Sequence, residues 1–164
     1  MGARPFVNVA SGGLAAVAAR HASSLKKRLG RFAYMWGALR AGVTAGPWEC
    51  RVRCDDRGVF SGDAWQVIVA SSGAFGGGSD IAEADPTDGI LDVTVIPAGS
   101  RLRLAQHAAG LRSGEVTAQR GVVHVRCRTA AVDGELKFNV DGELVSESAA
   151  RFGVSAAAFQ LVVG

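Results

Sequence analysis

Residues 121–144 of the chain read GVVHVRCRTAAVDGELKFNVDGEL, and this stretch decides the expected fold. It contains two strand-like runs, at 121–127 and 135–140. The dipeptide Asp133-Gly134 lies between these runs, and Asp141-Gly142 follows the second. Asp-Gly beside apolar runs is a strong signal for a tight β-hairpin turn, because glycine readily takes a positive φ. Short strands joined by such turns, without regular alternation of strands and helices, predict an antiparallel β-sandwich or barrel.

Further strands are expected on both sides of this stretch. Residues 48–54, WECRVRC, alternate in the way that places every second side chain on one face of a strand. The residues that share this face are Trp48, Cys50, Val52 and Cys54. Strand-like stretches rich in apolar residues lie at 6–11, 65–75, 90–97 and 156–164, and the one at 65–75 is expected to be a buried strand. The three consecutive glycines at 76–78 predict a flexible loop.

Two segments carry helical spacing instead. In residues 14–42, the apolar side chains that follow the i, i+3, i+4, i+7 spacing of a buried helical stripe are Phe32, Met35, Trp36 and Leu39. Residues 100–114 predict a second helix, with Ser100 as its N-cap and Gly114 as its stop. The apolar positions of this second helix are Leu102, Leu104, Ala108 and Leu111. The predicted fold class is therefore mainly β: one domain over 1–164, an antiparallel β-sandwich with a helical segment near the N-terminus and one mid-chain helix.

The composition is that of a globular protein. The chain has 164 residues, of which 48% are hydrophobic and 20% charged. No apolar run approaches the roughly 20 residues that a membrane span needs, and the N-terminus lacks the apolar core of a signal peptide, so we expect a cytoplasmic protein. The three cysteines, Cys50, Cys54 and Cys127, do not form the paired pattern of a disulfide framework, and we expect reduced thiols in preference to a zinc site.

The net charge of +3 is unevenly distributed along the chain. Residues 1–54 hold nine Lys or Arg and one acid, a net +8, whereas residues 55–164 hold nine basic residues and fourteen acids, a net −5. Such asymmetry is typical of proteins with an anionic partner, such as phosphate, nucleic acid or a membrane surface, and a solvated helix face gives the same pattern. The basic segment lacks the interleaved aromatic residues of single-strand binders, so we expect no nucleic acid partner.

An acidic cluster stands directly before one of the expected strands. Residues 81–93, IAEADPTDGILDV, contain four carboxylates, at Glu83, Asp85, Asp88 and Asp92. Proline and glycine within this segment predict a tight turn, which would direct carbonyl and carboxylate oxygens toward one point. Mg²⁺ and Ca²⁺ prefer such an all-oxygen arrangement. A plain, solvated acidic turn explains the same residues, and the spacing is not that of an EF-hand.

A second pair of acids lies at the end of the quoted stretch. In FNVDGE, residues 138–143, Asp141 and Glu143 are two positions apart and would share a face if the strand continued through Gly142. Two neighbouring carboxylates can separate their pKa values, which leaves one of them as a general base. If Gly142 breaks the strand, the two acids diverge, and the segment is a hairpin turn with exposed acids.

Four segments in this order resemble the diacylglycerol-kinase-like lipid kinases, a family that includes bacterial diacylglycerol kinases and sphingosine kinases. The segments are FVNVASGG, LKKRLGRFAYMWGALR, GAFGGGSDIAEADPTDGILDVTVI and FNVDGE. They extend over nearly the whole chain and match the family's C-terminal half only. The resemblance implies a β-sandwich domain that completes the active-site cleft of a two-domain, ATP-dependent lipid kinase.

The resemblance also implies partners. In that family an N-terminal domain binds ATP through a Gly-Gly-Asp-Gly-Thr type motif, which this sequence does not contain. We therefore expect the chain to be inactive alone and to work with an ATP-binding N-terminal domain or chain. The other expected partners are a lipid substrate such as diacylglycerol, a membrane surface beside the basic residues at 20–31, and a second copy of the chain that covers apolar surface in a homodimer.

The resemblance implies roles for five residues. In bacterial members the acidic turn holds a structural Mg²⁺, which implies Asp88 as the side-chain ligand, with Asp85 and Ile90 at the flanking positions. The VDGE strand end carries the acid that accepts the proton of the lipid hydroxyl, which implies Glu143, with Asp141 as the second choice. Two alternatives remain open: a non-catalytic β-sandwich module that keeps the fold, and, more remotely, a kinase for a sugar or for NAD.

Overall fold

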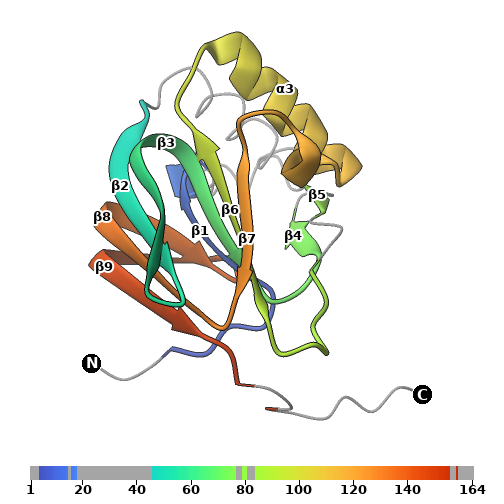
Figure 1. Cartoon of the computed structure of the whole chain (residues 1–164), viewed down its shortest axis with the longest axis vertical. Helices are drawn as coiled ribbons and strands as arrows, with labels where there is room; N and C mark the ends of the chain where they lie inside the picture. The colour runs from blue at the N-terminus through green and yellow to red at the C-terminus, as the bar shows by residue number, and fades with distance from the viewer. Residues whose placement is uncertain are drawn as a thin grey trace, which may run out of the picture.

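The computed structural model of the chain describes residues 4–14, 16–17, 46–76, 79–80, 84–155 and 158 (Figure 1). The elements in these ranges are β1 (Val9–Gly13), β2 (Trp48–Cys54), β3 (Arg57–Ala70), β4 (Ala74–Gly76), β5 (Ser79–Asp80), β6 (Leu91–Pro97), α3 (Arg101–Ser113), the 3-10 turn η1 (Val116–Ala118), β7 (Val123–Cys127), β8 (Thr129–Val140) and β9 (Glu143–Gly153). The predicted helical segment at 14–42 lies outside the described residues except for its first positions. The glycines at 77–78 and nearly all of the run at 156–164 also lie outside them.

Four strands close into a ring of antiparallel pairings. β1 pairs with β3 and with β8, and β2 also pairs with β3 and with β8. The two long strands make this closure possible, because each contacts β2 along one part of its length and β1 along another. β6 and β7 extend the sheet from β3, and β9 extends it from β8 (Figure 1). The prediction of a mainly β, antiparallel, sandwich-like domain is confirmed.

The main core lies inside the curled sheet. Alternation along the strands directs one face of each inward, as predicted for β2, whose Cys50, Val52 and Cys54 are all buried. Other inward residues of this cluster are Val67, Val69, Leu91, Val93, Val95, Val132 and Phe138. A second, smaller cluster on the outer face joins the sheet to α3 and η1 through Trp65, Ile96 and Val116. The sheet is therefore buried on both faces where α3 covers it.

The three cysteine side chains belong to the inner side of this arrangement. Cys50, Cys54 and Cys127 are free and buried. Burial, together with the nearby Asp63 and Glu49, raises the pKa of Cys50 to about 11. Burial of an ionisable thiol among apolar side chains favours its neutral form, so Cys50 acts as a small core residue.

The mid-chain helix has the predicted ends, and its buried face agrees with the prediction in part. Ser100 accepts a hydrogen bond from the backbone N–H of Arg103 at 3.3 Å, and Gly114 ends the helix with φ 77°. Leu102, expected on the apolar stripe, is 72% exposed, and Ala108 is also exposed. Leu104 and Leu111 pack against the cluster of Trp65, Ile96 and Val116, as predicted. The helix also buries His107 and Gly110, where the side chain of Gln119, just after η1, packs against it. No helix of the described ranges is long and apolar enough to cross a membrane.

Two turn predictions had opposite outcomes. The dipeptide at 141–142 forms the β8–β9 hairpin turn, with φ 45° at Asp141 and 94° at Gly142. The dipeptide at 133–134 was wrongly predicted as a turn, since Gly134 lies inside β8, at a bulge opposite β9. A Cβ on Gly134 would lie 2.8 Å from the backbone oxygen of Glu49, so this glycine serves a close approach of β8 to β2.

The boundaries of β3 also differ from the prediction of a strand over 65–75. β3 begins earlier, at Arg57, and ends at Ala70, and a bend at residues 71–73 precedes the separate β4. The early start depends on a two-residue turn at Asp55 and Asp56, both with positive φ, that joins β2 to β3. Asp-Asp is a weaker turn signal than Asp-Gly, which explains why the sequence does not reveal this hairpin.

Candidate functional site

Strand register brings polar side chains together on the outer face of the sheet. One row of opposed residues is Asn139, Ser11, Ile68, Thr94 and His124, from β8, β1, β3, β6 and β7. The next row is Val9, Ala70, Asp92 and Arg126, with Asp141 hydrogen-bonded beside Val9. Directly opposed residues of neighbouring strands share a face. The candidate site is therefore this end of the outer face, together with the turns that border it.

The acidic turn brings the three predicted metal-site residues close together. Asp85 Oδ1 accepts hydrogen bonds from the backbone N–H of Thr87 at 2.8 Å and from its hydroxyl at 2.7 Å. These bonds, led by that of the hydroxyl, lower the pKa of Asp85. Asp88 Oδ1 accepts from the N–H of Ile90 at 2.8 Å. In both cases an Asp side chain accepts from the N–H two residues further along the chain, which is an Asx turn. Two consecutive Asx turns therefore precede β6.

A buried carboxylate lies directly behind this turn. Asp92 is fully buried, and its Oδ1 lies 2.9 Å from Nε2 of His124 and 3.5 Å from Nε of Arg126. The guanidinium group of Arg126 also forms an ion pair with Asp88. Arg126 therefore joins the acidic turn to the buried Asp92. Within the described residues, Asp92 Oδ2 and the hydroxyl of Thr94 have no hydrogen-bond partner.

The arrangement of Asp88 bears on the predicted magnesium ion. The carboxylate of Asp88 accepts a hydrogen bond from the N–H of Ile90 and forms an ion pair with Arg126. The carboxylate of Asp85 accepts a hydrogen bond from the hydroxyl of Thr87. In the described ranges, no three His, Cys, Asp or Glu side chains are grouped closely enough to hold a metal ion. A cation at Asp88 would have to displace the guanidinium group of Arg126. The residues as arranged do not fit a magnesium ion at Asp88, and the metal site stays a prediction.

Asp141 organises the β8–β9 hairpin. Its carboxylate accepts hydrogen bonds from three successive backbone N–H groups, those of Val7 at 2.6 Å, Asn8 at 3.1 Å and Val9 at 2.9 Å. In return, the N–H of Asp141 donates to the carbonyl of Val9 at 3.0 Å. The carboxylate thereby fastens the entry of β1 to the hairpin turn. Asp141 has a clear structural role in this position.

Glu143 lies on the other side of the same turn and takes no part in these bonds to Val7, Asn8 and Val9. Because the chain reverses at Gly142, Glu143 starts β9 and is paired with Val140, so the two acids do not lie side by side along one strand. Its side chain is 68% exposed and forms an ion pair with Arg4. Of the two sequence-predicted acids, Glu143 is the one whose carboxylate is not held by backbone N–H groups, since its described partner is the exposed side chain of Arg4.

Several polar residues of this face are not evident from the sequence. The sequence marks Asp92 only as one acid of four, and it gives no reason to select Ser11, His124, Arg126 or Asn139. The available signal was the two-residue spacing of polar side chains, Asp92 with Thr94 and His124 with Arg126, inside otherwise apolar strands. Only the pairing of β6 with β7 shows that both pairs lie on one face.

Comparison with known proteins places this geometry in a family. The model of the YegS C-terminal NAD kinase beta sandwich-like domain matches residues 8–163. A crystal structure of a Bacillus anthracis str. Sterne diacylglycerol kinase superposes with a TM-score of 0.68 at 18% identity, covering 94% of this chain and 50% of that one. A candidate diacylglycerol kinase of the same strain gives a TM-score of 0.69 at 19% identity, covering 94% and 50%.

These matches define the fold and its extent. At such identities the structural similarity shows a shared fold, and the chain spans about half the length of the solved structures it matches. Among curated proteins, none matches the chain. The family model covers nearly the whole chain, and its β-sandwich is the architecture described above. The chain therefore belongs to the family of YegS C-terminal, NAD kinase β-sandwich-like domains.

Proposed function

We propose that the chain is the lipid-side domain of an ATP-dependent lipid kinase, which transfers the γ-phosphoryl group of ATP to a lipid hydroxyl such as that of diacylglycerol. The observation that carries this proposal is the position of Glu143. It is an exposed carboxylate on a hairpin that Asp141 fastens to β1, in a domain that belongs to a kinase-like C-terminal family.

The surroundings of Glu143 suit a lipid hydroxyl. The large apolar side chains that are exposed in the described part of the chain are Val7, Leu102 and Leu144. Two of them border the hairpin: Val7 is bonded to Asp141 through its N–H, and Leu144 follows Glu143 directly. An amphipathic substrate needs apolar surface for its chains beside a polar group for its head.

Glu143 is proposed as the general base. Its carboxylate takes the proton of the lipid hydroxyl while that oxygen bonds to the γ-phosphorus and the bond to the β-phosphate oxygen breaks, which releases ADP. The ion pair with Arg4 does not prevent this role, because an exposed ion pair is worth at most about 1 kcal/mol and opens readily. Arg4 is also suitably placed to attract the negative charge of a phosphoryl group.

The proposal requires an ATP-binding domain, on the same or a separate chain. Phosphoryl transfer depends mainly on in-line positioning and on charge around the phosphates. The hairpin and the rigid sheet would position the acceptor, and the second domain would position Mg²⁺-ATP. This division agrees with the chain's coverage of half of the diacylglycerol kinase structures.

A second candidate is a non-catalytic module of the same fold. The observation that favours it is that two of the candidate acids are already bound within the domain. Asp88 forms an ion pair with Arg126, and Asp141 accepts hydrogen bonds from backbone N–H groups. Both acids have structural roles that persist without any reaction. Glu143 is paired with the exposed Arg4 and has no such role in the described part of the chain, so its substitution separates the two candidates.

The test is an assay of phosphoryl transfer from ATP to diacylglycerol, with the chain alone and then with an ATP-binding domain of a related kinase. The proposal expects activity in the mixture and a loss of about 100-fold or more in Glu143→Gln, the usual range for a general base. Glu135→Gln, which removes an exposed carboxylate from the middle of β8, is the matched control and should keep full activity. Inactivity of every mixture with well-folded protein would favour the non-catalytic module.

A further inference from the structure

A hollow on the side of α3 gathers positive charge that the proposed reaction does not use. It has a volume of about 370 Å³, and the described residues that line it are Arg103, Gln106, His107, Gln119 and Arg120. No Asp or Glu is among these lining residues, and in the described part of the chain neither arginine forms an ion pair. Two guanidinium groups without a counter-charge favour an anionic ligand.

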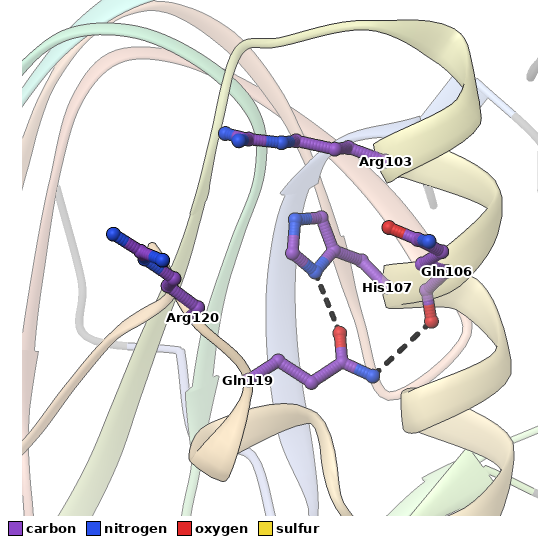
Figure 2. A pocket seen from close by; sticks show the side chains of 5 residues that line it. All are labelled: Arg103, Gln106, His107, Gln119 and Arg120. Carbon is purple, nitrogen blue, oxygen red and sulfur yellow. Dashed lines mark hydrogen bonds between the residues drawn. The ribbon is translucent and has the colours of Figure 1, made fainter.

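The hollow is built around a buried histidine. Figure 2 shows Arg103 and Arg120 extending to the same side, with the ring of His107 below the side chain of Arg103. The two arginines come from different elements, Arg103 from α3 and Arg120 from the segment between η1 and β7. His107 is 7% exposed, although it is polar. A buried polar group at the base of a charged hollow needs hydrogen-bond partners.

The hydrogen bonds of Gln119 fix how His107 faces the hollow. Gln119 Nε2 donates to the carbonyl of Gln106 at 3.2 Å, so its Oε1 is the atom that lies 2.6 Å from Nδ1 of His107. An amide oxygen only accepts, and therefore Nδ1 of His107 carries the hydrogen. The remaining ring nitrogen, Nε2, points to the side toward which both guanidinium groups extend (Figure 2).

The glycine at position 110 makes this arrangement possible. A Cβ on Gly110 would collide with the side-chain amide of Gln119. Glycine in the middle of a helix costs about 1 kcal/mol relative to alanine, so its presence in α3 has a compensating reason here. The compensation is the close approach of Gln119, which holds the ring of His107 in place. The hollow is therefore preorganised by residues that do not themselves carry charge.

We propose that Arg103, Arg120 and His107 form a binding site for a phosphoryl group, as inorganic phosphate or as a lipid headgroup. Guanidinium forks match the oxygens of a phosphate, and Nε2 of His107, which has no hydrogen-bond partner in the described part of the chain, can hydrogen-bond to a phosphate oxygen. The site lies near the Val123 end of β7, whereas Arg126 and the acidic turn lie near the other end of the same strand pair. It is independent of the proposed kinase function.

The first experiment is a titration of the full chain with inorganic phosphate at constant ionic strength, observed through the imidazole NMR signals of His107. The site predicts a saturable shift of these signals. Each of Arg103→Gln and Arg120→Gln should weaken binding by roughly tenfold to a hundredfold, since hydrogen bonds to charged groups are strong. Arg57→Gln, which removes an exposed arginine beside the β2–β3 turn, is the matched control and should bind as the unchanged chain does.

A second arm distinguishes the two sources of the phosphoryl group. The chain is sedimented with phosphatidylcholine vesicles that contain or lack phosphatidic acid. Sedimentation only with phosphatidic acid, lost in Arg103→Gln and Arg120→Gln and kept in Arg57→Gln, supports the site with a lipid headgroup as its ligand. A shift with free phosphate alone supports a soluble ligand. Binding in neither arm, or equal binding by all three variants, overturns the proposal.

Discussion

At the scale of single residues, Asp141 combines an unusual backbone conformation with three hydrogen bonds. Its φ of 45° lies in the left-handed region, which Asn and Asp tolerate better than other non-glycine residues. Its carboxylate caps three consecutive N–H groups at the entry of β1. The side chain and the backbone therefore both restrict this position to Asp or Asn.

Asp141→Ala is expected to lower the free energy of unfolding by about 1–3 kcal/mol, because the N–H groups of the β1 entry lose their acceptor. Asp141→Asn keeps one acceptor oxygen and should lose less. Urea denaturation measures both. Asp56→Ala is the control, because Asp56 has a φ of 63° and its side chain makes no hydrogen bond within the described residues. Equal losses in Asp141→Ala and Asp56→Ala would show that backbone strain alone explains the effect.

The ion pair between Arg126 and Asp88 limits what the acidic turn can bind. Its guanidinium group already supplies a positive charge to Asp88 and approaches the buried Asp92. A divalent ion at Asp88 would compete with this arginine for the same carboxylate. The choice between a guanidinium group and a metal ion at this turn is therefore open to a direct experiment.

We expect Mg²⁺ at millimolar concentration to leave the thermal unfolding midpoint of the unchanged chain as it is. In Arg126→Gln the carboxylate of Asp88 is released, and a rise of the midpoint with Mg²⁺ is expected, because a ligand that binds only the folded state stabilises it. Differential scanning calorimetry with Mg²⁺ and with EDTA measures this. Stabilisation of the unchanged chain by Mg²⁺ that Asp88→Asn abolishes would establish the metal site predicted from the sequence.

At the scale of elements, the pentapeptide VDGEL occurs twice and shows how far the sequence predicts structure. At 132–136 it lies within β8 and forms a bulge, and at 140–144 it forms the β8–β9 turn. Local turn chemistry is the same in both copies. The neighbouring strand decides the outcome, since Gly134 lies against the backbone of β2 at Glu49. The local sequence does not predict contacts of this kind between residues far apart in the chain.

Gly134→Ala is expected to destabilise the domain by about 2–4 kcal/mol. The new methyl group would lie 2.8 Å from the backbone oxygen of Glu49, and the φ of 146° at this position is strained for any residue with a side chain. Gly58→Ala is the control, because a Cβ there meets nothing within 4 Å. Chemical denaturation of both variants tests the account. A neutral Gly134→Ala would mean that β8 can move away from β2 without cost.

At the scale of the whole molecule, the closed ring of β1, β3, β2 and β8 explains why distant segments meet at one site. The sequence predicts the strands β2 and β6 and the ends of α3 closely, because their periodicity and caps are local signals. It predicts the candidate acids in the same way, through turn residues. It does not predict the polar rows across the sheet, because the positions of Asp92 and Arg126 relative to each other depend on strand pairing alone.

The same ring depends on carboxylates that hold loops together. Asp55, in the β2–β3 turn, accepts hydrogen bonds from the N–H groups of Arg128 and Thr129 and from the hydroxyl of Thr129, and so connects this turn to the start of β8. These bonds, led by that of the Thr129 backbone, lower the pKa of Asp55. The pKa of Asp85 is lowered by Thr87 in the turn before β6. Both carboxylates thus favour the folded state when they are ionised.

The sign of the pH dependence follows from these two lowered pKa values. A carboxyl group with a lower pKa in the folded than in the unfolded chain stabilises the fold above its unfolded pKa, near 3.9, and loses this contribution as the pH falls through the folded pKa. The free energy of unfolding should therefore decrease below about pH 4.

Asp55→Asn and Asp85→Asn should be less stable than the unchanged chain at pH 7, and the difference in the free energy of unfolding should shrink in acid, where Asp is neutral as well. Urea denaturation from pH 7 to pH 2 measures the curves, with Asp56→Asn as the control. A difference that stays constant to pH 2 would show that these side chains act through shape, independently of their charge.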